Sequence, residues 1–431
     1  MHEREKNWIL WSLFLMMILL NADQMVMSPN INMIEKEFRI GDSQIGYIAS
    51  SFTVIGAILS LIWGFLSDKY SRKKLLFYAV LVGEIPCMLS AFATSYVGLF
   101  TLRALTGIGV GAMFPVSFSL VGDIFDAKER GKVAAYLSTA VSIGIILGMV
   151  IGGYVGGVYG WRIPFLLVSI PNIVIILIFY KIIEEPKRGA AEEKVEDLVR
   201  KGYVYSSNVK LSDYLKLFTI KTNLLLFLQG ISGTIPWGAI PYFLITFLNR
   251  SRGLSIAQAT TIFIIFGLGN IIGILYGGLL GSFFYKKSPK YMPLFCAITT
   301  FMGTFFVLWT LGYKGGNYIV LASLGFFSAA LASMTGPNVK TMLLNVNEPE
   351  NRGRIFSIFN LTDSLGTGIG KLVGGLISTA LGSLGAALNI SALFWLPCAV
   401  LLFFVTAFMS KDIGRLNKIM EEKRRQMESG I

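Results

Sequence analysis

Long apolar stretches recur along the whole chain, and short polar or charged segments separate them. A bilayer core of roughly 30 Å is crossed by a helix of about 20 apolar residues. The first such stretch begins at Trp8, and stretches of this length continue almost to the end of the chain. The pattern predicts transmembrane helices at 8–28, 44–66, 74–93, 97–121, 132–158, 162–183, 221–248, 256–283, 291–312, 317–343, 354–381 and 384–409.

Composition supports this prediction of an all-α membrane protein with twelve transmembrane helices. The chain of 431 residues is 54% hydrophobic and only 15% charged, and its mean hydropathy is +0.64. These values exclude an ordinary soluble protein. Prolines within the spans, such as Pro86, Pro115 and Pro236, do not argue against helices, because membrane helices tolerate proline.

The distribution of basic residues predicts the orientation of the chain. With the N-terminus in the cytoplasm, 30 Lys and Arg lie on the cytoplasmic side, 6 lie on the outer side and 2, Arg103 and Lys371, lie inside the membrane, which together make the 38 of the sequence. This asymmetry follows the positive-inside rule, so we expect a cytoplasmic membrane protein with both termini in the cytoplasm. The net charge of +13 is spread over separate short loops, which does not favour a nucleic-acid surface.

Cysteine and histidine usage argues against an enzyme and against a metal centre. Cys87, Cys296 and Cys398 lie in different predicted helices without metal-ligand spacing, and the one histidine is His2. A Ser-His-Asp site and a histidine-containing zinc site therefore lack their usual component. We expect no catalytic residues, no metal and no cofactor.

An internal duplication relates the two halves of the chain. At an offset of 222 residues, the segments 129–132 and 351–354 correspond, and Gly148, Gly152 and Gly153 match Gly370, Gly374 and Gly375. At an offset of 213, Gly64, Leu66, Lys73 and Lys74 match Gly277, Leu279, Lys286 and Lys287.

We therefore predict two pseudo-symmetric six-helix bundles, at 1–183 and 221–410, with a cytoplasmic tail at 411–431. Parallel repeats of this kind bind a substrate between the halves and move it by alternating access. The charged segment 184–220 is predicted to be a cytoplasmic linker, either with an amphipathic helix on the membrane surface or as a solvated tether.

Several motifs resemble those of the major facilitator superfamily. The segment 64–74, with Gly64, Asp68 and Arg72, resembles the signature G-x-L-x-D-r-x-G-R-r between helices 2 and 3, with Ser71 in place of the last glycine. Further matching segments are Arg103 with Gly107, Gly109 and Gly111, then Asp123 with Glu129, Arg130 and Gly131, and finally Gly160, Trp161 and Arg162 with Pro164 and Phe165. The resemblance implies the major facilitator fold and secondary transport.

Within that superfamily the sequence is most similar to Spinster-type transporters, through Asp23, the loop signature and Gly122-Asp123-Ile-Phe. It departs from the usual pattern at Gln24, where the subfamily has arginine, and at Val110, where it has glutamate. The resemblance implies a lysolipid-like or sphingolipid-like amphipathic solute. A drug or metabolite exporter of the same superfamily is the alternative, and a receptor or scaffold without transport is a remote one.

The segments that resemble the family signatures suggest a gate on the cytoplasmic side. Asp68 can face the N-terminus of helix 11, where a helix dipole favours negative charge, and Arg72 can pair with Asp123. Such contacts would form when that side is closed and break when it opens. We assign Gly64, Asp68, Arg72, Asp123, Arg130 and Arg352 to this gate. The simpler interpretation is a basic loop that only sets topology, which does not explain Asp68.

Glycines recur at every fourth position of predicted helix 5, at Gly144, Gly148 and Gly152. Such a stripe allows another helix to approach closely. Met149 stands where drug antiporters of the superfamily have proline, so the stripe indicates helix packing and gives no direction of transport.

Charged residues within the spans are the strongest functional candidates, because each costs about 2.5 to 3.5 kcal/mol at a helix centre on insertion scales. Asp23 and Arg103 lie at similar depth in helices 1 and 4, which pack together in the resembled family, so we expect them to pair. Protonation of the carboxylate would release the arginine and couple protons to movement. A static structural pair is the alternative. Glu84, near the middle of helix 3, is assigned to proton coupling or to a hydrogen-bonded structural role.

Asp363 and Lys371 straddle the midpoint of helix 11, and Lys371 occupies the position of Met149 in the first half. We assign substrate binding to these two charges with Asn360, Thr362, Gln229 and Trp237; an internal pair of Asp363 with Lys371 is the alternative. The expected partners are a small-molecule or lipid-like substrate, protons and membrane lipids, without nucleic acid, and the expected state is a monomer.

Overall fold

The computed structural model describes residues 3–125, 127–185, 211–348 and 351–428. Within these ranges the secondary structure is helical throughout. By length and composition, ten helical segments are long and apolar enough to cross a membrane. Two further long helices, α4 (Arg72–Ser90) and α16 (Arg352–Leu381), are less apolar because they carry charged residues. Together they supply the twelve expected helices.

Contacts divide the chain into two compact units. Unit 1 holds residues 1–207 and 242–260, and unit 2 holds residues 208–241 and 261–431. The second part of α11 (Lys221–Arg252) and the first turns of α12 (Ile256–Lys287) thus group with unit 1. The bundle boundaries given by the sequence stay a prediction. The short α10 (Leu211–Leu217) falls in the predicted linker.

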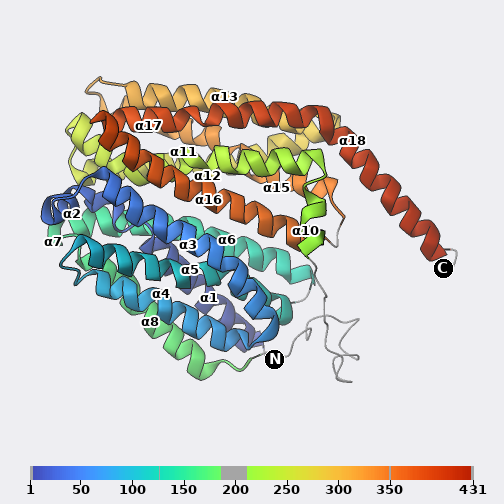
Figure 1. Cartoon of the computed structure of the whole chain (residues 1–431), viewed down its shortest axis with the longest axis horizontal. Coiled ribbons are helices and arrows are strands. Elements are labelled where there is room, and N and C mark those ends of the chain that lie inside the picture. The colour runs from blue at the N-terminus through green and yellow to red at the C-terminus, as the bar shows by residue number, and fades with distance from the viewer. Residues whose placement is uncertain (1–2, 126, 186–210, 349–350, 429–431) are drawn as a thin grey trace. The chain divides into compact units, whose positions relative to one another are not determined.

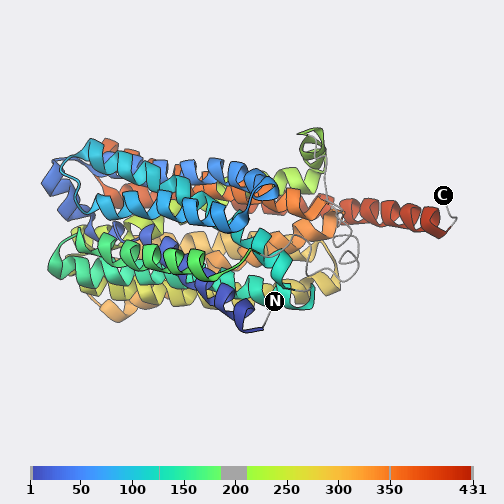
Figure 2. The ribbon, with the colours of Figure 1, turned by 90° about the horizontal axis from the view of Figure 1, so that it is seen from below.

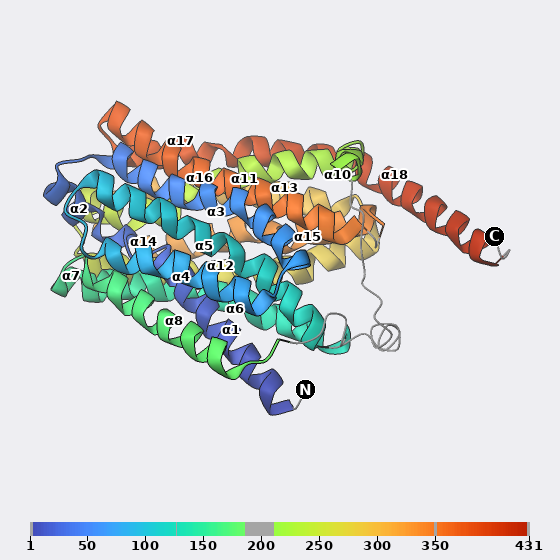
Figure 3. The ribbon, with the colours of Figure 1, turned by 60° about the horizontal axis from the view of Figure 1, so that its bottom comes forward.

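Unit 1 is built around α5 (Tyr96–Ile124), which packs against α3 (Asp42–Lys69) on one side and against α4 on another. Figures 1 and 3 show α4 alongside α8 (Ile163–Ile182). Buried Leu, Ile, Val and Met side chains from α1, α4, α5, α6 and α8 form one core cluster. In α5, Gly107 and Gly111 lie against the backbone of α3, and Gly109 lies against the backbone of α4.

The first membrane segment of unit 1 is broken near its middle. The helix α1 (Glu3–Asp23) ends at Asp23, a short turn follows, and the 3-10 helix η1 (Ser28–Asn30) leads into α2 (Ile31–Phe38). Pro29 lies in this region and has no N–H to continue the helical hydrogen bonds. The break leaves Asp23 at a helix C-terminus.

The glycine stripe of segment 5 packs against segment 1. The segment consists of α6 (Ala127–Val150), a π-helical turn η2 (Ile151–Val155) and α7 (Gly156–Tyr159). A Cβ atom added at Gly144 or Gly148 would run into the main-chain oxygen of Ile18 or Ala22. The amide of Asn30 donates to the Gly152 carbonyl at 2.8 Å, within the π-helical turn.

Unit 2 repeats this arrangement with its own helices. Its remaining elements are α13 (Tyr291–Gly312), α14 (Tyr318–Ser333), α15 (Thr335–Val346), α17 (Leu384–Leu393) and α18 (Trp395–Glu428). A Cβ atom at Gly366 or Gly370 of α16 would strike the carbonyl of Ile231 or Ile235 on α11. These contacts match those of Gly144 and Gly148 at the offsets of 222 and 213 residues found in the sequence.

The last helix, α18, packs against α13 and then continues past the other helices of unit 2 to the C-terminal end (Figures 1 and 2). The tenth membrane segment is divided into α14 and α15 at Met334. Pro337, three residues after the break, cannot donate to the Ser333 carbonyl, which explains why the helix does not run through.

Candidate functional site

Asp23 and Arg103 form a buried ion pair in unit 1. The Arg103 guanidinium donates through Nη1 to Asp23 Oδ1 and through Nη2 to the Asp23 main-chain oxygen at 3.1 Å. The exposed fractions of the two side chains are 0% for Asp23 and 3% for Arg103. Arg103 therefore neutralises the carboxylate and also satisfies a carbonyl at the C-terminus of α1, where helix dipoles favour cations.

Aromatic rings complete the surroundings of the guanidinium. Its central carbon lies 4.6 Å from the ring centre of Phe52 and 5.4 Å from that of Phe165. Cation–π attraction strengthens where water is excluded, so these rings favour the charged arginine in its buried position. The three side chains come from α3, α5 and α8.

Glu84 and two polar residues that the sequence did not single out lie around the pair. The Cys87 thiol donates to Asp23 Oδ1 at 2.9 Å, and the Asn172 amide donates to Glu84 Oε1 at 2.6 Å. Cys87 follows Glu84 by three residues, so both lie on one face of α4. From the sequence, this spacing could have placed Cys87 beside Glu84. Asn172 could have been selected as a polar residue within the apolar run of α8.

The predicted substrate residues all belong to α11 and α16 in unit 2. The Thr234 hydroxyl of α11 donates to the main-chain oxygen of Asp363 at 2.9 Å, which holds the two helices together. Lys371 is buried, with 2% of its surface exposed, and Thr362 is buried as well. Asn360, in contrast, is exposed on unit 2.

Gln229 and Trp237 face residues of the twelfth segment. Gln229 Nε2 donates to Cys398 Sγ at 3.4 Å, while its carbonyl oxygen is buried without a hydrogen-bond partner. The rings of Trp237 and Trp395 lie 5.7 Å apart, and the Trp395 indole donates to the Gly233 carbonyl at 2.8 Å. Gln229 thus keeps one buried polar atom without a hydrogen-bond partner.

Of the predicted gate, the structure describes the contacts of Arg72 and Gly64. Arg72 is buried and donates to Glu185 Oε1 through its main-chain N–H at 2.6 Å and through Nε at 3.3 Å. Ser71, the N-cap of α4, donates its hydroxyl to the same carboxylate. Gly64 lies near Pro115 of α5. The side chains of Asp68, Asp123, Arg130 and Arg352 lie outside the described residues.

Glu185 is a partner that sequence reasoning missed. Its carboxylate accepts from the first N–H group of α4, that of Arg72, and a helix N-terminus favours negative charge. Glu185 comes directly after the sixth membrane segment, so the chain leaving unit 1 is held at the signature loop. The charged pair Glu184-Glu185 ahead of a basic run was the available signal.

The opposite end of unit 1 carries two more ion-pair clusters. Glu37 accepts from Arg162 at 2.6 and 2.7 Å and from the Trp161 indole at 2.7 Å. The hydrogen bond to Glu37 raises the pKa of Arg162. Arg250, on the part of α11 that belongs to unit 1, donates to Asp42 at 2.9 Å, to Asn32 and to Glu35.

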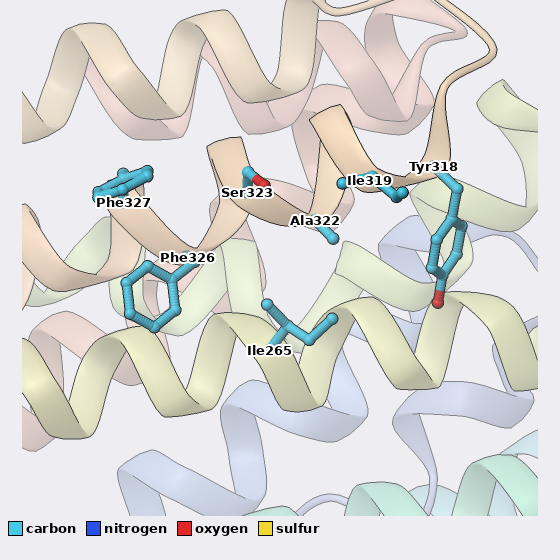
Figure 4. A pocket seen from close by; sticks show the side chains of 7 residues that line it. All are labelled: Ile265, Tyr318, Ile319, Ala322, Ser323, Phe326 and Phe327. Atoms are coloured by element: carbon cyan, nitrogen blue, oxygen red, sulfur yellow. The ribbon is translucent and has the colours of Figure 1, made fainter.

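A cavity of about 290 Å³ lies between α12 and α14 of unit 2. Figure 4 shows Ile265 of α12 facing Ala322, Phe326 and their neighbours on α14. Its lining is apolar apart from Tyr318 and Ser323, and it contains none of the predicted site residues. In the described residues, no cluster of three or more His, Cys, Asp or Glu side chains is arranged to hold a metal ion.

Comparison with known proteins establishes the family. The model of the Major Facilitator Superfamily matches residues 13–326 and 222–425, so this chain belongs to that superfamily and is a multi-pass membrane transporter, not an enzyme. The hexuronate transporter of Bacillus subtilis is 23% identical over 96% of this chain and 98% of its own length. Protein spinster homolog 1 of Xenopus laevis is 25% identical over 79% of this chain and 66% of its own length.

Solved structures agree on the fold. A bacterial homologue of the human lysosomal transporter Spinster, crystallised in an inward-facing and unoccupied conformation, superimposes with a TM-score of 0.83. The match has 17% sequence identity and covers 96% of this chain and 99% of the other. The major facilitator fold expected from the sequence is therefore confirmed, and the resemblance to Spinster-type transporters is matched by Spinster proteins among both the relatives and the solved structures.

Proposed function

We propose that this transporter couples solute movement to protons through Asp23 and Arg103. The observation that carries the proposal is the ion pair itself, which is fully buried and linked to the end of α1. Buried charges in a membrane protein are expensive and mark ion or proton pathways. Within the described part of unit 1, this pair provides an acid whose protonation changes a contact of α1.

The coupling step follows from the two contacts of Arg103. Protonation of Asp23 removes the negative charge that holds the guanidinium, and the hydrogen bond to the Asp23 main-chain oxygen weakens as the arginine moves. The backbone at the break after Asp23 can then change conformation, because the C-terminus of α1 loses its cation. A static pair that only stabilises unit 1 is the competing interpretation.

The substrate class that the residues support best is a small organic acid. Lys371 is a cation buried in the middle of α16, at a position where the first half has the apolar Met149. Buried cations bind carboxylates through charge-assisted hydrogen bonds. The hexuronate transporter, a relative along nearly the whole chain, carries a substrate with a carboxylate according to its name.

An amphipathic lysolipid-like or sphingolipid-like solute is the second candidate. It is supported by the similarity to protein spinster homolog 1 and by the fold match to the Spinster homologue. In this case Asp363 and Lys371 would bind a zwitterionic headgroup, with Gln229 and Trp237 at its side.

We further propose that the protein works as a monomer in the cytoplasmic membrane. The distribution of Lys and Arg supports an orientation with both termini inside. In that orientation Arg72, Ser71 and Glu185 lie on the cytoplasmic side. We assign them to a gate with Asp68, Asp123, Arg130 and Arg352.

Uptake by purified protein in liposomes tests the proposal. The panel contains a hexuronate, an aldarate, a neutral hexose, a lysophospholipid and a sphingoid base, each with and without an imposed pH gradient. We expect gradient-driven accumulation of the acids, with no response to the neutral hexose. Transport confined to the lipids would support the second candidate. Transport that ignores the pH gradient for every substrate would refute proton coupling.

A further inference from the structure

Glu84 is an acid in the membrane-buried core of unit 1, and among the described residues its carboxylate forms a hydrogen bond with Asn172 and no ion pair. Its side chain is fully buried, and the Asn172 amide donates to its Oε1 at 2.6 Å. Its second oxygen, Oε2, has no hydrogen-bond partner, and the carbonyl oxygen of Asn172 has none either. Each of these atoms would be costly to bury unsatisfied.

A proton on Glu84 would give both of these oxygens a hydrogen-bond partner. A protonated carboxyl group donates through one oxygen and accepts through the other. With the proton on Oε2, Glu84 can donate to the Asn172 carbonyl while its Oε1 accepts from the Asn172 amide, as in a cyclic acid–amide pair. The acid is then neutral and needs no counter-ion in the hydrocarbon region.

The charges around Glu84 suggest what this proton is for. Three elements bring titratable groups toward it: Asp23 at the end of α1, Arg103 on α5 and Cys87 on its own helix α4. Asp23 is the carboxylate that holds Arg103 in the structure. If Asp23 became protonated, the guanidinium would be left buried without a counter-ion, which is strongly unfavourable.

We infer that Glu84 is the alternate counter-ion of Arg103, neutral and paired with Asn172 while Asp23 is ionised, and ionised when Asp23 takes up a proton. The exchange balances: one proton binds to Asp23, one leaves Glu84 Oε2, and the core keeps one guanidinium and one carboxylate throughout. Two acids that share one cation in this way titrate as a coupled pair. The inference rests on the proposed role of Asp23 for its place in transport, but the proton on Glu84 does not.

Infrared spectroscopy of the purified protein in lipid tests this directly, because a protonated carboxyl group has a C=O stretch apart from that of a carboxylate. The band removed by Glu84→Gln is assigned to Glu84. At neutral pH we expect the band in the wild type and a shifted band in Asn172→Leu, which lacks the amide partner. Absence of any band that Glu84→Gln removes would overturn the inference.

The exchange leaves the number of bound protons unchanged, so a change of pH alone does not drive it. A variant that fixes Asp23 in a neutral form is therefore the test. Asp23→Asn, which mimics the protonated state, should lose the band at neutral pH, and Asp23→Asn with Arg103→Met should regain it. A Glu84 band that persists at full strength in Asp23→Asn would refute the exchange.

Thermal stability gives a readout if a variant is weakly expressed. Glu84→Gln keeps an amide that can pair with Asn172, so its melting temperature should stay close to that of the wild type. The double variant Asp23→Asn with Glu84→Gln should lose more than the sum of the single losses, because Arg103 then has neither counter-ion. Additive losses would count against the shared cation. Coupling to a pH gradient is measured separately in liposomes. Failure of the proposed function can therefore be told apart from failure of the inference on Glu84.

Discussion

At the scale of single residues, the proposed function depends on a few charges that are kept out of water. Asp23 and Arg103 form an ion pair, and Arg103 also binds the main chain at the break of the first membrane segment. The same side chain thus serves as counter-ion and as helix cap. In the proposed mechanism, this double role links the protonation of Asp23 to the conformation of α1.

We predict that Asp23→Asn abolishes accumulation driven by a pH gradient but leaves exchange of labelled for unlabelled substrate. The asparagine cannot lose a proton, so the cycle can no longer couple to the gradient. The measurement is liposome uptake against counterflow in the same preparation. Glu421→Gln, an exposed acid on α18, is the matched control and should behave like the wild type. Gradient-driven accumulation by Asp23→Asn would show that the pair is only structural.

A second residue-scale prediction concerns Lys371→Met, which copies Met149 from the first half. The loss of one charge-assisted hydrogen bond should weaken binding of an acidic substrate on the order of tenfold to a hundredfold. Methionine fills a similar volume, so folding should be preserved. Binding measured by calorimetry, with a neutral analogue as control, checks this. Equal weakening for both ligands would place Lys371 outside the substrate site.

At the scale of elements, helix contacts depend on glycines that allow backbones to touch. The glycines of α6 lie against α1, and the glycines of α16 lie against α11. The two contacts occupy equivalent positions of the repeat. Backbone contact at these points fixes the position of α1 along α6, and therefore the position of Asp23.

Gly148→Ala should destabilise the protein by about 1–3 kcal/mol, because its Cβ strikes the Ala22 carbonyl and the helices must separate. Gly157→Ala is the control in the same segment, because its Cβ would have only Ile256 Cγ2 at 3.9 Å. This control should be neutral or slightly stabilising through helix propensity. Thermal unfolding in detergent compares the two. Equal stability of both variants would show that the close approach is not required.

At the scale of the whole molecule, two helices, α11 and α12, contribute residues to both compact units. The first part of α11 lies in unit 2, and residues 242–252 lie in unit 1, where Arg250 contacts Glu35, Asp42 and Asn32. Arg250 therefore joins the second part of α11 to α2 and α3 of unit 1.

Arg250→Gln should lower the stability of unit 1 by about 1–2 kcal/mol, since it leaves Glu35 and Asp42 close together without the cation. Adding Glu35→Gln should recover part of the loss by removing one of the two negative charges. Melting temperatures of the single and double variants provide the test. No recovery in the double variant would mean that packing, not charge, is the main contribution of Arg250.

The sequence by itself determined the class of protein, the number of membrane segments and the duplication. These follow from the length and spacing of apolar runs, because each membrane helix must satisfy its own backbone in a medium without water. The pairing of Asp23 with Arg103 was also accessible, since two opposite charges at one depth have few other ways to be stable. The substrate assignments for Asp363, Lys371 and their neighbours stay predictions.

Only the tertiary structure decided which polar groups meet. It placed Cys87 on Asp23, Asn172 on Glu84 and Glu185 on Arg72, and it ended α1 at Asp23. Hydropathy cannot supply these contacts, because they depend on how helices rotate about their axes and on breaks set by proline and neighbouring side chains. Apolar periodicity specifies that a helix crosses the membrane, whereas packing against its neighbours specifies which face it turns toward the buried charges.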